Sequence, residues 1–255
     1  MLSISNLSAN LPIAQFALIF AQNKKTMFGL PTHLQKTDDI ELKQIMQKTI
    51  MLQNGVVAMQ MAKSGVKGLM NYGVPLPDLR RIAAEAGINH ALARRLCQLN
   101  IREARILASM LFDANSLNKD DLTLIASSIT NIDMAESFAQ NIVSKIADIA
   151  FFNTLRDGNK WHLLTAIHGV GWCIAQHRQH SDILSDWLLT NLEDIVNKNI
   201  TETFQPIIST MSAIADMSEQ KKLTIENAAQ KLLSAQSAFA QNIGNQFIQL
   251  YMSEF

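Results

Sequence analysis

The 255-residue chain has few cysteines, few prolines and no net charge. Its two cysteines, Cys97 and Cys173, have no CxxC partner, which excludes a disulfide framework or a zinc knuckle and predicts a reducing, cytoplasmic location. Lys and Arg number 22, as do Asp and Glu, so the strong overall basicity of many nucleic-acid-binding domains is missing. Any contact with nucleic acid must therefore come from a local concentration of charge.

A long apolar run is also missing. The most apolar stretch near the N-terminus, residues 11–21, is interrupted by Pro12 and Gln15 and has no Lys or Arg before it. A signal peptide needs a basic start, and a membrane span needs about 18 apolar residues. We therefore interpret the stretch as an amphipathic helix within an N-terminal helical extension, residues 1–37, and expect no membrane contact.

Helical periodicity dominates the rest of the sequence. No proline occurs between Pro77 and Pro206, and apolar residues recur there at steps of three and four. About ten to twelve short helices favour stacked antiparallel pairs. We predict an all-α, HEAT-like helical-repeat superhelix in a single domain, residues 1–255. The expected helices cover about 77–86, 90–98, 101–112, 119–128, 132–147, 160–176, 182–196, 202–217 and 225–252, with either two helices or one kinked at Gly55 in 38–62.

Two adjoining stretches carry a family resemblance. The first contains Tyr72-Gly73-Val74 followed by Pro77 and Leu79-Arg80, and the second is the run 90–110, which includes the hexapeptide Glu103-Ala104-Arg105-Ile106-Leu107-Ala108. Both stretches resemble the AlkD-like DNA alkylation repair glycosylases, whose fold is a superhelix of HEAT-like repeats. The resemblance implies hydrolysis of the N-glycosidic bond of cationic alkylpurines in double-stranded DNA. We expect no cofactor and no metal.

The resemblance also implies a catalytic segment. The family has Trp-Asp followed three residues later by the key Asp, and this chain has Ile132, Asp133 and Glu136 at those positions. Glu136 keeps the negative charge but extends it by one methylene, about 1.5 Å. Ile132 removes an aromatic face worth about 1–2 kcal/mol towards a cation. The candidate catalytic residues are therefore Glu136 and Asp133, with catalysis weakened or lost.

Two further family positions are changed. The family's phosphate-holding Arg aligns with Leu164 or Thr165, and its second cleft Trp aligns near Met211 or Ser212. Asp133 also has an alternative interpretation, because Thr130-x-x-Asp133 is a capping-box pattern at a helix start, and we prefer that role for it. For Glu136 two interpretations stay open, a residue of the active site and an ordinary surface residue.

Charge is distributed unevenly along the chain. Residues 53–111 contain eight basic and three acidic residues, whereas residues 112–157 contain three basic and seven acidic ones. The basic block either lines a groove for nucleic acid or forms a solvated, internally paired surface, and the second is the commoner arrangement. The candidate nucleic-acid-binding residues are Arg80, Arg81, Arg94, Arg95 and Arg105.

The segment 161–180 is the densest group of potentially reactive side chains. Cys173 and His177 share a helix face, but a complete tetrahedral metal set is not evident, and no basic neighbour lowers the pKa of the Cys173 thiol. We expect Trp161 and Trp172 to pack between helices. The leading hypothesis is a DNA-associated member of the repair family, and the alternative is a non-catalytic scaffold that binds a protein partner on its concave face. The sequence does not determine the oligomeric state.

Overall fold

The computed structural model describes residues 39–64, 66 and 69–251, so the predicted N-terminal extension lies outside the described residues. The described chain forms thirteen α-helices joined by short turns, and it contains no strand. The all-α helical-repeat fold is confirmed. None of the helices in these ranges is long and apolar enough to cross a membrane.

The helix bounds follow the predicted pattern in most places. They are α4 (Ile40–Met51), α5 (Gly55–Lys63), α6 (Leu76–Ala86), α7 (His90–Cys97), α8 (Arg102–Leu111), α9 (Lys119–Ser128), α10 (Ile132–Asn141), α11 (Ile149–Asp157), α12 (Lys160–Ala175), α13 (Ser181–Asn197), α14 (Phe204–Ala215), α15 (Glu219–Leu233) and α16 (Ala238–Tyr251). The single helix predicted for 225–252 is wrong, because the chain turns between α15 and α16.

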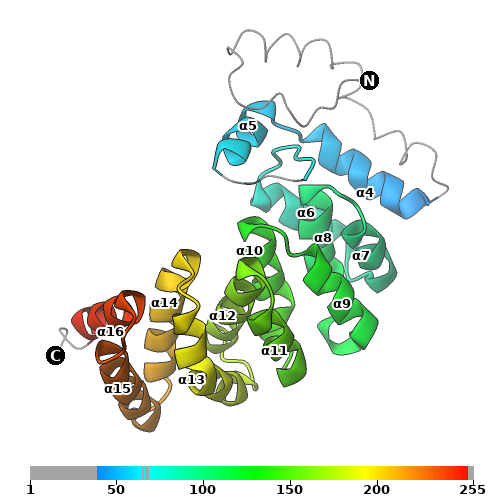
Figure 1. Ribbon diagram of the computed structural model, residues 1–255. Coiled ribbons are helices and arrows are strands. Elements are labelled where there is room, and N and C mark those ends of the chain that lie inside the picture. The colour runs from blue at the N-terminus through cyan, green and yellow to red at the C-terminus, as the bar shows by residue number, and fades with distance from the viewer. Residues whose placement is uncertain (1–38, 65, 67–68, 252–255) are drawn as a thin grey trace.

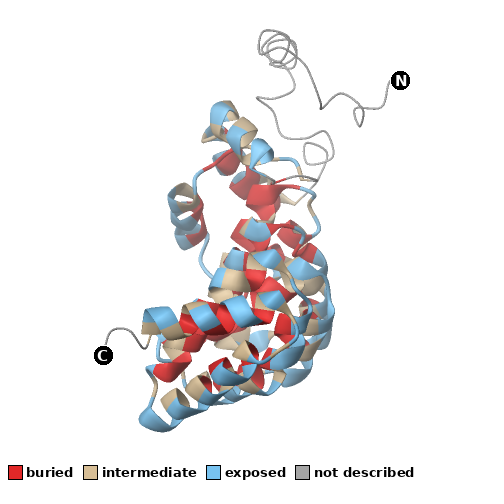
Figure 2. Cartoon of the chain, turned by 60° about the vertical axis from the view of Figure 1, so that its left-hand side comes forward, coloured by how far each residue is buried: buried red, intermediate tan, exposed pale blue. Residues whose placement is uncertain are grey.

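The helices stack into a curved row from α4 to α16 (Figure 1). One layer is formed by α6, α8, α10, α12, α14 and α16, each packed on the next, and a second layer by α7, α9, α11, α13 and α15. The buried faces of the helices meet between the layers in one continuous apolar core, and Figure 2 shows exposed residues on their outer sides. We call the first layer the inner layer, because it carries the cleft described below.

Local signals explain several helix ends. Gly87 ends α6 with φ +68°, a left-handed conformation that favours glycine. The Asn118 side chain and Asp121 form the capping box that starts α9. The Asn54 side chain accepts the backbone N–H groups of Val56 and Val57 and so caps the start of α5, which makes the segment 38–62 two helices rather than one kinked helix.

The predicted helix over 132–147 is too long. The α-helix α10 ends at Asn141, a 3-10 turn follows at Val143–Lys145, and Asp148 caps a separate helix, α11, that the sequence reading missed. Phe151, Phe152 and Leu155 form the buried face of α11, but its nine residues are too few for the periodicity to stand out.

Candidate functional site

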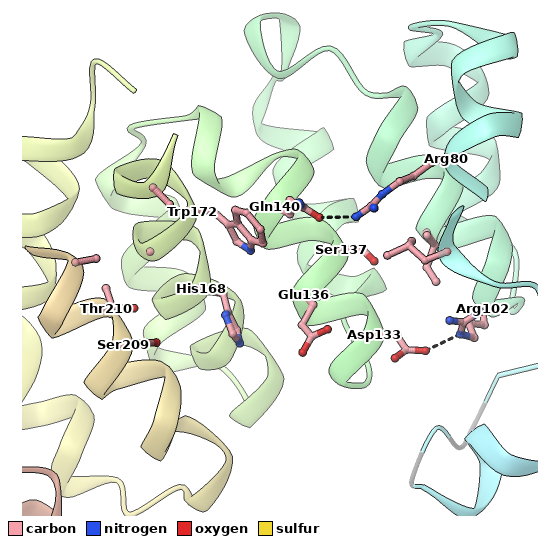
Figure 3. Close-up of a pocket in the computed structure, with 15 residues that line it drawn as sticks. Arg80, Arg102, Asp133, Glu136, Ser137, Gln140, His168, Trp172, Ser209 and Thr210 are labelled. Atoms are coloured by element: carbon pink, nitrogen blue, oxygen red, sulfur yellow. Dashed lines mark hydrogen bonds and ion pairs between the residues drawn. The ribbon is translucent and has the colours of Figure 1, made fainter. Parts of the chain in front are cut away.

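A cleft of about 630 Å³ opens on the inner layer of helices. Five helices supply its walls, and Figure 3 shows their side chains pointing into a common space. The lining residues are Leu76 and Arg80 from α6, Arg102 and Ile106 from α8, Asp133, Glu136, Ser137 and Gln140 from α10, His168, Gly171, Trp172 and Ala175 from α12, and Ser209, Thr210 and Ala213 from α14.

Both predicted catalytic residues lie in this cleft. Asp133 and Glu136 are three residues apart on α10, and both face the same space. The capping role preferred for Asp133 is wrong. The N-cap of α10 is Asn131, whose side chain accepts a hydrogen bond from the backbone N–H of Met134, and the Asp133 carboxylate instead binds Arg102.

A buried ion network holds Asp133 in place. Arg102 has a side chain only 5 % exposed, and it donates from Nε to Asp133 Oδ2 at 2.5 Å and from Nη1 to Glu103 Oε1 at 3.1 Å. Glu103 is fully buried and also accepts the backbone N–H groups of Tyr72 and Val74. Burial and the charge of Glu103 raise the pKa of Tyr72 to about 12.

This network gives the residues that carry the family resemblance a structural role. Gly73 lies between the two amides that Glu103 binds, has φ +69°, and would bring a Cβ to 2.2 Å from the Asn54 carbonyl oxygen. Only glycine therefore fits this turn without a backbone shift. The Tyr-Gly-Val turn and Glu103 are thus structural residues that fix α6, α8 and α10 relative to one another.

Glu136 and His168 are the two ionisable cleft residues that have no partner within the described ranges. In the described part of the chain neither side chain makes a hydrogen bond or an ion pair, and Figure 3 shows both projecting into the cleft, from α10 and α12. Desolvation by the cleft walls, with the nearby charge of Asp133, raises the pKa of Glu136 above its ordinary value. Desolvation lowers the pKa of His168.

The prediction that Trp172 packs between helices is wrong. This residue is 36 % exposed and turns its ring into the cleft, one turn beyond His168 on α12. Trp161 is partly buried against the core, as expected. The sequence reading missed Trp172 and His168 as cleft residues, and the i, i+4 spacing of these two side chains was the available signal.

The residues aligned with the family's Arg and second Trp do not line the cleft. Leu164 and Thr165 are buried in the core, as is Met211, and Ser212 does not line the cleft. The cleft-facing residues of α14 are Ser209, Thr210 and Ala213. The wall that α14 contributes is therefore small and uncharged.

Two hydroxyl groups are free on the cleft walls. Ser137 and Thr210 are nearly buried residues, and neither hydroxyl has a hydrogen-bond partner among the residues that the structure describes. Gly171 lies opposite Thr210, and a Cβ at this position would approach Thr210 Oγ1 to 3.1 Å. The glycine thus keeps the Thr210 hydroxyl accessible from the cleft.

Of the five arginines predicted to bind nucleic acid, Arg80 lines the cleft, where it donates to Gln140 Oε1 at 3.4 Å. The other four lie outside the lining and bind protein groups. Arg81 pairs with Asp78 and Glu85, Arg94 with Asp121, and Arg95 with Asp39 and Glu41, while Arg105 donates to the carbonyl oxygens of Leu99 and Ser128 and to Thr130. Arg102, which was not among the candidates, is the second arginine of the cleft.

The potentially reactive side chains of the segment 161–180 do not gather at one site. Within residues 39–64, 66 and 69–251, no three His, Cys, Asp or Glu side chains are grouped to hold a metal ion. Cys173 is buried, contacts Ser181, and has a pKa raised by burial, which suits an inert thiol. His177 is exposed, and its backbone is left-handed with φ +48°.

The fold and the cleft define an all-α helical-repeat protein with a polar site on its inner layer. A family model described as DNA alkylation repair enzyme matches residues 45–200, which is more than half of the chain. The chain therefore belongs to the DNA alkylation repair enzyme family. No curated protein and no solved structure matched the sequence in the corresponding searches.

Proposed function

We propose that this protein is an AlkD-like DNA glycosylase of HEAT-like fold, which releases cationic alkylpurines from duplex DNA slowly. The observation that carries the proposal is the position of Glu136, the residue aligned with the family's key Asp, on a cleft that also presents the ring of Trp172. Membership of the repair family supports it.

The chemistry of the lesion explains why so few groups suffice. An alkylated purine with a positive charge is already a good leaving group, so the protein has to stabilise the cationic sugar that remains when the base departs. A carboxylate supplies that stabilisation, and an aromatic face attracts the cationic base. Glu136 takes the first role and Trp172 the second, in place of the Trp that Ile132 has replaced.

Binding of the DNA phosphates requires cationic side chains at the edge of the cleft. Gln140 and Ala175 lie near the C-terminal ends of α10 and α12, and Arg80 reaches this edge through Gln140. Arg178 lines an adjoining cavity that shares Ala175 and Ala213 with the cleft. Its Nε is buried and has no hydrogen-bond partner among the described residues. The pKa of Lys145 is lowered by burial and by the charge of Arg178, so the two cations lie near each other. We assign the phosphate contacts to Arg80, Arg178 and Lys145.

Catalysis is tested by base release from duplex DNA that carries 7-methylguanine. We expect slow release by the wild type and about 100-fold slower release by Glu136→Gln, because the variant keeps the shape but removes the charge. Glu193→Gln is the matched control, since Glu193 is exposed on α13 of the second layer. Release that Glu136→Gln leaves unchanged would contradict the residue assignment.

DNA binding is tested separately by salt titration. Arg80→Gln is expected to reduce the slope of log affinity against log salt by about one, as the loss of one phosphate contact requires. Arg81→Gln is the control, because the neighbouring Arg81 pairs with Asp78 and Glu85 and does not line the cleft. Equal effects of the two variants would reject Arg80 as a cleft contact.

One observation favours the scaffold as the second candidate. The charged residues that line the cleft balance, with Arg80 and Arg102 against Asp133 and Glu136, whereas a DNA-binding face is usually positive. A wild type that neither releases base nor binds DNA in a salt-sensitive manner would support a scaffold that binds a protein partner. For either candidate we propose a single domain in the cytoplasm, with the one continuous core and the two free, buried cysteines in support.

A further inference from the structure

The cleft holds two unpartnered ionisable residues, and the family resemblance accounts for only one of them. His168 and Glu136 project into the same cleft from the adjacent helices α12 and α10, and neither is bound to another protein group in the described chain. Of the other charged groups of the cleft, Arg102 and Asp133 bind each other, and Arg80, which donates to Gln140, is assigned above to a phosphate contact. Glu136 and His168 are therefore the ionisable groups that remain available to a ligand.

The surroundings of His168 favour its neutral form. The charged groups around His168 are Glu136 and Asp133 on α10, Arg102 on α8 and Arg80 on α6, while α14 contributes only hydroxyls and Ala213. Desolvation lowers the pKa of His168, so the imidazole is neutral at pH 7 and has a free lone pair. Desolvation and the charge of Asp133 raise the pKa of Glu136, and no cation is bound to its carboxyl group among the described residues.

We propose that His168 accepts the proton of the water that attacks the sugar, while Glu136 stabilises the positive charge on that sugar. This inference rests on the proposed glycosylase function. In the reaction the bond from C1′ to the purine nitrogen breaks, and its electron pair neutralises the cationic base. The water oxygen forms a new bond to C1′, and the imidazole takes its proton. The imidazolium then returns that proton to solvent, so atoms and charge balance.

The arrangement suits two groups with different tasks. A carboxylate next to the sugar is most useful as a charge, whereas a neutral imidazole is a better proton acceptor near neutral pH. The free hydroxyls of Ser137 and Thr210 lie on the same walls and offer further hydrogen bonds to the water or the sugar. His168 also lies one turn from Trp172, so the proton acceptor and the aromatic face come from one rigid helix.

The test is the single-turnover rate of 7-methylguanine release by His168→Ala, with and without added imidazole. We expect a loss of about 100-fold, which is typical of a missing general base, with unchanged DNA affinity. Added imidazole should restore part of the rate, in proportion to its neutral form, because the variant leaves a space of that shape. His180→Ala, outside the cleft, is the control and should behave like the wild type.

The outcomes separate this inference from the proposed function. Release by the wild type together with an unchanged rate in His168→Ala overturns the role of His168 and leaves the glycosylase function standing. A loss that imidazole does not restore, or one that appears in DNA affinity, shows a packing or binding role and also overturns it. Absence of release by the wild type overturns both. His168→Gln keeps most of the side-chain volume and should show the same loss if His168→Ala does not fold.

Discussion

Replacing Glu103 by Gln tests the ion network that stands behind the cleft. Glu103 is fully buried and accepts hydrogen bonds from Arg102 and from the backbone amides of Tyr72 and Val74. Gln preserves the shape, but it places an NH₂ donor against groups that are themselves donors and removes the charge next to Arg102. Breaking a buried pair in this way typically costs about 3–5 kcal/mol.

That cost is large for a protein of this size. Free energies of unfolding are about 5–15 kcal/mol, and a change of 1 kcal/mol shifts Tm by about 2–4 °C in chains of 150–250 residues. We therefore expect Glu103→Gln to lower Tm by about 6–20 °C, measured by circular dichroism at 222 nm. A parallel urea titration gives the change in free energy.

Glu85→Gln provides the comparison. Glu85 also pairs with cations, Lys48 and Arg81, but these pairs are exposed, so their loss should leave Tm almost unchanged. Equal Tm values for the two variants would refute the reasoning, because burial would then have no effect on the cost. A selective loss in Glu103→Gln would show that Asp133 is held by a network anchored behind the cleft.

Three further changes follow from the same structure. Trp172→Ala should weaken binding of DNA carrying a cationic base by about 5- to 150-fold, the range expected for one stacked base, while Trp172→Phe retains most of it; equal affinities in a titration would exclude stacking. Gly73→Ala should lower Tm, because its Cβ would lie 2.2 Å from the Asn54 carbonyl oxygen, and an unchanged melting curve would contradict that geometry. In the folded protein the Asp121 carboxyl stays ionised to unusually low pH. Its pKa is lowered mainly by the hydrogen bond from Arg94, and further by the Asn118 amide and His90, which together outweigh its desolvation. The stability that it contributes should be complete above about pH 4 and lost as the pH falls further, so the Tm difference between wild type and Asp121→Asn should shrink there, and a constant difference would refute the linkage.

Much of the fold was determined by local sequence. The steps of three and four in apolar positions, the capping residues such as Asn118, and Gly87 act over a single helix turn, so they predict α6 to α9 closely. The same local geometry placed Asp133 and Glu136 on one face of α10. These features need no knowledge of neighbouring helices.

The tertiary structure decided which side chains meet in the cleft. The helix α12 is buried on most of its surface, so its hydrophobic pattern does not mark the strip that borders the cleft, and His168 and Trp172 were not recognised there. Arg102 and Asp133 are 31 residues apart, and their contact depends on the packing of α8 against α10. Sequence periodicity specifies the faces of single helices, whereas a site built from five helices depends on how those helices pack.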